Sequence, residues 1–195
     1  MMGGFKPIAA AAALALIAAL GACSGGDTAA EQAGGGDAAS RTLAAAISGD
    51  SDLSTVSGAL SEAGLADVFD GPGSYTILAP DDDAFDALGE GGKTLTAEDH
   101  KAELVAVLRG HILPGHLTPD AILKAIADKK GPVTMRTLDD EQVTFSAQGK
   151  TITVTGANDA KATIDGDALV ASNGVVLPVN GFVKRAPEAA ATPAA

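Results

Sequence analysis

The chain has 195 residues, with 25 acidic and 13 basic side chains, a formal net charge of -12 and one cysteine. A protein this acidic is repelled by phosphate backbones, so we expect no nucleic-acid partner. One cysteine cannot build an internal disulfide framework or a structural zinc site.

The beginning of the chain predicts an export signal. Lys6 is followed by an apolar run over residues 8–20, which is too short to span a hydrocarbon core of about 30 Å and is typical of a signal peptide. Residues 20–23, LGAC, resemble the lipobox of bacterial lipoproteins, in which the Cys23 thiol receives a lipid. The alternative is a plain secretory signal with an incidental cysteine, but the one cysteine of the chain stands where a lipobox needs it.

These features predict four segments along the chain. Residues 24–40 are rich in Gly, Ala and small polar side chains, which is typical of a flexible tether. We therefore expect a signal peptide over 1–22, a tether with the lipidated Cys23 over 23–40, a folded domain over 41–186 and a disordered tail over 187–195. By analogy with lipoprotein sorting, Ser24 after the cysteine favours the outer membrane, with the lipid as the membrane contact.

The first half of the folded segment predicts helices around one strand. Apolar residues three and four positions apart indicate helices from Leu43 and, after a cap at Asp52, from Leu53. A strand is expected over 74–79, with Pro80 ending its pairing. Asp81 is the expected N-cap of a short helix through Leu88.

Two more helices are expected before the chain changes character. Thr96 and Asp99 resemble a capping box ahead of a helix that buries Leu104. Thr118 before Pro119 predicts another helix start. The buried side of that last helix should carry Leu123 and Ile126.

The second half predicts short strands rich in Thr and Val, separated by turn residues. The expected strands are 133–138, 143–147, 151–155, 162–165, 168–171, 174–179 and 182–185. The first three should form an antiparallel meander. Helices that come early and strands that come late indicate an α+β domain with segregated layers.

Three segments resemble the fasciclin-like (FAS1) domain family, in the order in which that family has them. They are SYTILAPDDDAFDAL at 74–88, LRGHILPG at 108–115 and ASNGVV at 171–176. Two departures stand out: Gly110 replaces the tyrosine that usually precedes the histidine, and Val176 is followed by Leu177 and Pro178 in place of the usual pattern.

The resemblance implies a wedge-shaped β-sandwich with helices packed against it. It also implies adhesion or interaction at the cell surface, through a protein or polysaccharide partner, without catalysis. The segments that carry the resemblance supply candidate binding or structural residues: His111, Leu113, Pro114, Asn173 and Gly174.

The candidate chemical groups have structural alternatives. His111 could be a base, a metal ligand or a contact residue, but a histidine next to an apolar segment is more often a core hydrogen-bonding group. His116 lies at no helical ligand spacing from it, so no metal site is expected. Residues 81–83, three aspartates, fail the EF-hand spacing and are better explained as helix capping. Asn173-Gly174 is a turn signal typical of a structural hairpin.

Two other functions remain open beside adhesion. A carrier of a small apolar ligand such as a carotenoid is known among fasciclin-like proteins, but the mature chain has few aromatic side chains with which to line such a site. The other is a hydrolase that uses His111, but the sequence contains no nucleophile elbow and no recognisable triad spacing. We therefore expect no enzyme and no cofactor.

Overall fold

The computed structural model describes residues 40–184, apart from the side chain of Asn158. All these residues belong to one unit of the chain, residues 33–195. The predicted signal peptide, the tether with Cys23 and the tail of 187–195 lie outside the described residues. Within the described part, no helix has the length and apolar character needed to cross a membrane.

The helices follow the apolar spacing and the capping residues of the sequence. They are α1 (Leu43–Ser48), α2 (Ser54–Glu62), α3 (Ala66–Asp70), α4 (Asp82–Ala87), α5 (Glu90–Leu95), α6 (Lys101–Arg109) and α7 (Pro119–Lys129). Thr42 caps α1, Asp81 caps α4 and Thr118 caps α7, each with a side-chain oxygen that accepts a hydrogen bond from a backbone N–H three residues on. The caps predicted at positions 81 and 118 are confirmed.

Two predicted caps are wrong. Asp50, and not Asp52, accepts the capping hydrogen bond, from the N–H of Asp52 at 3.0 Å, and a short 3₁₀ turn then leads into α2. The Thr96 hydroxyl donates backward to the carbonyl of Gly92 at 3.1 Å and caps no helix; a 3₁₀ turn over Glu98–His100 leads into α6, which has no side-chain cap. The last turn of α5 makes this bond possible, and α5 was not expected because its sequence, EGGKTL, contains two glycines.

The first sheet has the strand order β2-β1-β8-β7. Its strands are β1 (Tyr75–Pro80), β2 (Ile112–Pro114), β7 (Leu169–Ala171) and β8 (Gly174–Val179). β1 and β8 are parallel, with Tyr75 opposite Gly174 and Pro80 opposite Val179. Strand pairing therefore includes Pro80, one residue beyond the predicted end at position 79. β2 was not predicted as a strand; it runs antiparallel to β1.

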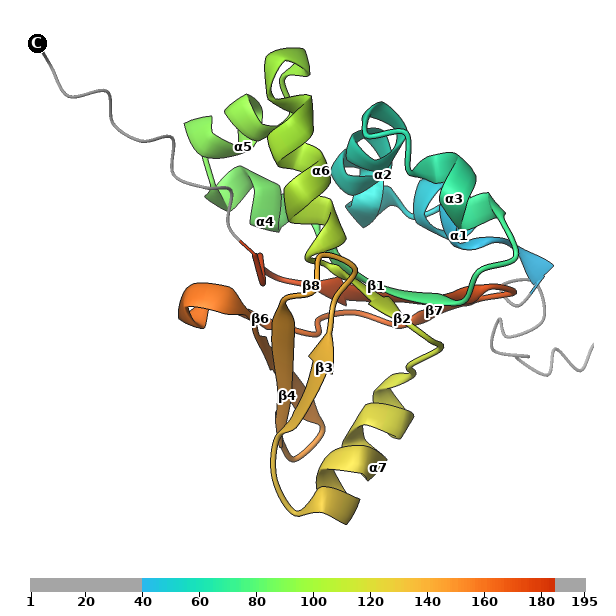
Figure 1. Ribbon diagram of the computed structural model, residues 1–195, viewed down its shortest axis with the longest axis vertical. Helices are drawn as coiled ribbons and strands as arrows, with labels where there is room; N and C mark the ends of the chain where they lie inside the picture. Colours follow the sequence, from blue (N-terminus) through green and yellow to red (C-terminus); the bar gives the residue numbers. More distant parts are fainter. Residues whose placement is uncertain (1–39, 185–195) are drawn as a thin grey trace, which may run out of the picture. The chain divides into compact units, whose positions relative to one another are not determined.

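The second sheet is the predicted antiparallel meander, extended by one strand. It consists of β3 (Val133–Arg136), β4 (Gln142–Gln148), β5 (Thr151–Thr155) and β6 (Lys161–Thr163) in chain order. Helix α7 packs against β3 and β4 (Figure 1). The fold is therefore the predicted α+β class: a two-sheet sandwich with helices packed against it.

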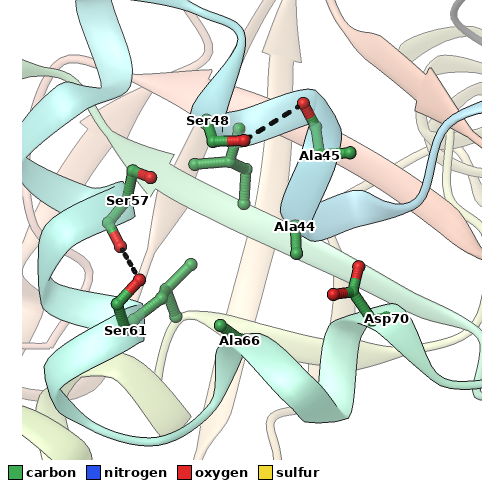
Figure 2. Close-up of a pocket in the computed structure, with 9 residues that line it drawn as sticks. Ala44, Ala45, Ser48, Ser57, Ser61, Ala66 and Asp70 are labelled. Carbon is green, nitrogen blue, oxygen red and sulfur yellow. Dashed lines mark hydrogen bonds between the residues drawn. The ribbon is translucent and has the colours of Figure 1, made fainter.

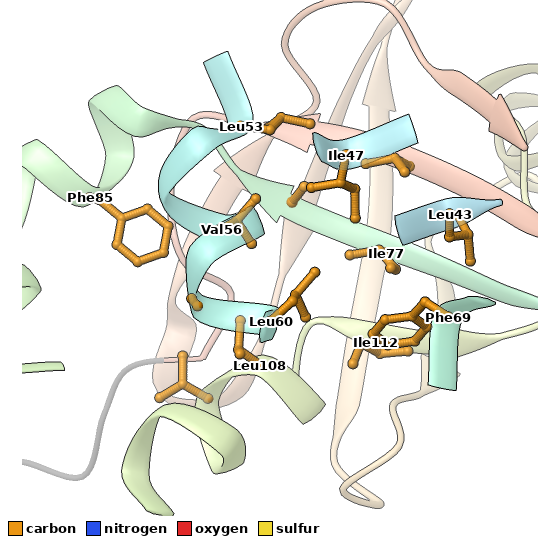
Figure 3. Close-up of a cluster of buried hydrophobic side chains, with 14 of the residues drawn as sticks. Leu43, Ile47, Leu53, Val56, Leu60, Phe69, Ile77, Phe85, Leu108 and Ile112 are labelled. Atoms are coloured by element: carbon orange, nitrogen blue, oxygen red, sulfur yellow. The ribbon is translucent and has the colours of Figure 1, made fainter. Parts of the chain in front are cut away.

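Two apolar clusters hold the layers together, one on each face of the first sheet. The first joins that sheet to the N-terminal helices, and Figure 3 shows Ile47, Leu60, Phe69 and Ile77 within it. The second fills the space between the two sheets and α7. Its members are Leu78, Leu113, Ile122, Val143, Phe145, Ile152, Val154, Ala162, Val175, Leu177, Val179 and Val183. Because both clusters are built within residues 43–183, this part of the chain has a core of its own.

The structure confirms one further expectation and corrects another. Leu123 and Ile126 lie on the buried side of α7, half-buried against the second cluster, beside Ile122, which is buried and was not predicted there. Residues 182–184 were expected in a strand but form none; the N–H of Val183 donates to the side chain of His111 and not to a neighbouring strand.

Candidate interaction site

His111 lies in the junction between the end of α6 and the start of β2, and both of its ring nitrogens are engaged. The N–H of Val183 donates to Nε2 at 3.0 Å, so Nδ1 carries the proton and donates to the Val107 carbonyl at 2.8 Å. The side chain is 1% exposed, and Phe182 packs edge-on against the ring at a centroid distance of 5.5 Å.

Burial controls the protonation of this histidine. It lowers the pKa of His111 from 6.5 to about 4, although the Val107 carbonyl and Asp139 act in the opposite direction. The imidazole is therefore neutral near pH 7, with its acceptor nitrogen already in a hydrogen bond. Such a group has no free lone pair to offer a metal ion or a substrate proton.

A charged cluster lies against Gly110, the residue before this histidine. Lys184 forms ion pairs with Asp139 and, at 2.9 Å, with Glu141. Burial opposes both charges, yet the hydrogen bonds between the partners hold the pKa of Asp139 below and that of Lys184 above its ordinary value. A Cβ atom at Gly110 would overlap the aliphatic part of Lys184. The glycine that departs from the family pattern is therefore the residue that lets this lysine lie across the junction.

Leu113 and Pro114 belong to β2 and differ in exposure. Leu113 is fully buried in the second apolar cluster, whereas Pro114 is exposed and pairs with Tyr75. The loop that follows is fastened by buried Thr76, whose hydroxyl donates to the Gly115 carbonyl at 2.8 Å and accepts from the Leu117 N–H at 2.9 Å. Of these two candidates, Pro114 is the one that a partner could touch.

Asn173 joins three parts of the first layer. Its Oδ1 accepts from the N–H of Leu43 at 2.8 Å, and its Nδ2 donates to the carbonyls of Phe69 and Gly71 at 2.6 and 2.9 Å. Residues 172–173 form the turn between β7 and β8, which confirms a hairpin here but places Gly174 inside β8. A Cβ at Gly174 would overlap the carbonyl oxygen of Tyr75, so the close approach of β1 requires glycine at this position.

The candidate residues do not form one site: His111 lies beside the middle of β1, whereas Pro114, Asn173 and Gly174 lie around Tyr75, its first residue. The His111 carbonyl accepts from the N–H of Leu78, whereas the Asn173 carbonyl accepts from the N–H of Tyr75. Three residues of an extended strand separate these positions by about 10 Å. His111 is buried, Asn173 is half-buried, and the polar atoms of both side chains are bonded to backbone groups, so neither side chain offers a free polar group.

The aspartates at 81–83 act on helix ends. Asp81 accepts from the N–H of Ala84 at 2.7 Å, while Asp82 accepts from the Thr55 N–H at 2.8 Å and so caps α2 across the fold. Burial and its acidic neighbours raise the pKa of Asp81; burial also opposes the charge of Asp82, but hydrogen bonds from Ser54 and Thr55 lower the pKa of Asp82. Among residues 40–184, no three His, Cys, Asp or Glu side chains are placed to hold a metal ion.

A pocket of about 290 Å³ lies between α1, α2 and α3 (Figure 2). Small side chains line it together with Ile47 and Leu60. Two of its hydroxyls are bonded to their own helices, that of Ser48 to the Ala45 carbonyl and that of Ser61 to the Ser57 carbonyl. Its one ionisable side chain, Asp70, accepts from the Thr42 hydroxyl at 2.5 Å. This arrangement offers neither a nucleophile beside a base nor an aromatic wall for a polyene.

The aromatic side chains of the described domain are used in packing. Phe69 and Phe145 are at most 1% exposed, and Phe85 meets Phe182 edge-on at a centroid distance of 4.9 Å. Tyr75 packs edge-on against Phe69. These contacts leave no stacked aromatic surface for the apolar carrier that the sequence left open.

Sequence reasoning missed the charged cluster of Lys184, Asp139 and Glu141. Lys184 is more than forty positions from both acidic partners, and nothing in the local sequence marks the three as partners. The glycine at position 110 was the signal available, because it removes a large side chain beside the histidine.

Comparison with known proteins agrees with this fold. The fasciclin domain family matches residues 51–183. Protein sll1483 of Synechocystis sp. is 30% identical over 136 residues, which cover 69% of this chain and 68% of that protein. Transforming growth factor-beta-induced protein ig-h3 of Sus scrofa is 29% identical over 145 residues, 73% of this chain but 19% of that protein.

A solved structure supports the same assignment at the level of the fold. The FAS1 domain pair of the insect cell adhesion molecule Fasciclin I superposes with a TM-score of 0.67 at 14% identity, over 75% of this chain and 52% of that chain. The resemblance first carried by the segments at 74–88, 108–115 and 171–176 is confirmed, since all three fall within the matched residues. The chain belongs to the fasciclin domain family.

Proposed function

We propose that this chain is an adhesion or interaction module of the bacterial cell envelope, which binds a surface protein or polysaccharide. The observation that carries the proposal is that a fasciclin domain, a fold also present in an insect cell adhesion molecule, has its candidate chemical group, His111, sealed inside the protein. A domain of this kind acts through its surface and not through a reacting side chain.

The proposal places the domain at the outer membrane, on a lipid attached to Cys23. The lipobox-like residues 20–23 and the small-residue segment of 24–40 support it. A lipid with two or more acyl chains anchors a protein firmly, and a tether lets the domain reach partners beyond the headgroups.

Binding to the envelope tests this function directly. The chain of residues 24–195 keeps every described contact and lacks the anchor, so its attachment to intact cells and to extracted envelope fractions of the source organism can be measured in solution. We expect saturable binding that one fraction competes away. Binding that neither saturates nor is competed by any envelope fraction would overturn the proposal.

A further inference from the structure

The outer face of the second sheet is an ordered array of hydroxyl groups. The register of β3 to β6 places Thr134, Thr144 and Thr155 side by side in one row, which ends at Lys161 on β6. The next row on the same face consists of Ser146, Thr153 and Thr163. We call these six side chains the hydroxyl face.

The hydroxyl face is open because the apolar side chains of the same strands point the other way. Phe145 and Val154, which alternate with the hydroxyl residues, are fully buried against α7 and the first sheet. All six members of the hydroxyl face are exposed or half-buried. Thr134 and Thr144 share a hydrogen bond of 3.2 Å, whereas the hydroxyls of the other members make none to a described residue.

The charge of these strands differs from that of the rest of the protein. The whole chain has a net charge of -12, yet β3 to β6 contain no Asp or Glu at all. Their charged side chains are Arg136 and Lys161, both exposed and neither in an ion pair with a described residue. An uncharged or weakly polar polymer therefore meets no carboxylate along these strands.

The chemistry of the hydroxyl face selects among partners. Protein interfaces depend on buried aromatic or aliphatic anchors, and this face presents none. Arg136 and Lys161 on the edge strands β3 and β6 attract a polyanion locally, but the net negative charge of the domain opposes it. Hydroxyl groups both donate and accept, as do the hydroxyls of a sugar, and threonine loses little rotamer freedom on binding because its χ1 is stiff.

We propose that the hydroxyl face is the docking surface for a neutral polysaccharide chain. Neighbouring strands place its hydroxyls about 4.8 Å apart, and alternate residues repeat along each strand about every 6.7 Å. A flat lattice of this kind suits an extended polymer better than a compact ligand. The proposal rests on the proposed function and names the partner class and the surface.

Paired substitutions on β5 test this surface. Thr153→Val with Thr155→Val removes two hydroxyls but keeps the side-chain shape and the strand propensity. Thr153→Ser with Thr155→Ser keeps the hydroxyls and is the matched control. The chain of residues 24–195 and both variants would be titrated against dextran, mannan and galactan, with alginate as the polyanion, and against the envelope fractions of the source organism.

We expect the wild-type chain to bind at least one of the neutral polysaccharides with little dependence on salt. The valine pair should bind it about tenfold more weakly, and the serine pair within about twofold of wild type. Urea unfolding should give all three a similar midpoint, which separates lost binding from lost folding. If the valine pair bound as tightly as wild type, the proposal that the hydroxyl face is the docking surface would be overturned.

The failures of the two proposals can be told apart. Wild-type binding to alginate or to an envelope protein fraction, with none to a neutral polysaccharide, overturns the neutral-glycan inference and leaves the envelope function standing. Binding to no envelope fraction overturns both.

Discussion

The backbone N–H of Val183 donates a hydrogen bond to Nε2 of His111 at 3.0 Å, across 72 positions of the chain. The bond fastens the segment after β8 to the junction between α6 and β2. Lys184, the next residue, adds its ion pairs with Asp139 and Glu141. The end of the described domain is thus held by one buried imidazole and one charged cluster.

Removal of this imidazole should destabilise the domain. In His111→Ala the N–H of Val183 and the carbonyl of Val107 lose their partner inside the protein, and we expect a loss of about 1 to 3 kcal/mol in the free energy of unfolding. Urea unfolding measures it. His116→Ala, at an exposed histidine, is the control and should change little. Equal unfolding midpoints for both variants would show that His111 contributes no buried hydrogen bonds.

The same histidine should make stability depend on pH. Because burial lowers the pKa of His111 from 6.5 to about 4, the unfolded chain binds the extra proton between these values and the folded chain does not. Its contribution is complete above about pH 6.5 and is lost as the pH falls toward 4, by about 1.4 kcal/mol per pH unit at most. Unfolding at pH 7 and pH 4.5 should show a smaller loss in His111→Gln than in wild type. Parallel losses would place the pH dependence on the carboxylates instead.

A side chain at position 110 should displace the lysine above it. Gly110→Ala brings a Cβ into the space of the Lys184 side chain, which then gives up its partners Asp139 and Glu141, and we expect a cost of about 1 to 2 kcal/mol. The Lys184→Ala background removes most of that overlap. A double-mutant cycle should therefore be non-additive, with a smaller cost of Gly110→Ala when Lys184 is absent. Additive costs would mean that the lysine does not respond to the glycine.

Asn173 should hold α1 against the hairpin of β7 and β8. Asn173→Ala leaves the N–H of Leu43 and the carbonyls of Phe69 and Gly71 without this partner, at a cost of about 2 kcal/mol. Amide hydrogen exchange should become faster in α1 than in α7, which Asn173 does not touch. Asn173→Asp keeps the acceptor for Leu43 and should protect the start of α1 better than alanine does. Uniform exchange across both helices would contradict a local role.

Cys23→Ser should release the protein from membranes. The prediction rests on the lipobox-like residues 20–23, because the thiol is the atom that would carry the lipid. Fractionation of cells that express the full chain measures it, with wild type as the membrane-bound reference. A serine variant that still sediments with membranes would show that another part of the chain provides the attachment.

Much of the fold could be predicted because its causes are local. The caps at Asp81 and Thr118, the meander of β3 to β5 and the three family segments all follow from residues a few positions apart. The errors at Asp52, Thr96 and residues 182–184 are also instructive. Asp50 and Gly92 lie two and four positions away, so there one local hydrogen bond formed in place of another, whereas His111 lies 72 positions from Val183 and no local pattern could reveal it.

The candidate site was predicted less well, since residue type does not reveal exposure. His111, Leu113 and Gly174 are buried, and the side-chain amide of Asn173 is hydrogen-bonded to backbone groups. The hydroxyl face could not be predicted because each strand carries only one or two of its residues, which is what strand propensity alone produces. The register of four strands is needed to turn them into one surface.

The sequence by itself determined the family, the α+β class, most element positions and the expectation of a lipid anchor, because apolar periodicity, capping and signal motifs act over short distances along the chain. The tertiary structure alone decided that His111 is sealed by Val183, that Lys184 lies across Gly110 and that six hydroxyls share one open face. These relationships join residues far apart in sequence, and their geometry exists only once both sheets and the helices have packed around a common core.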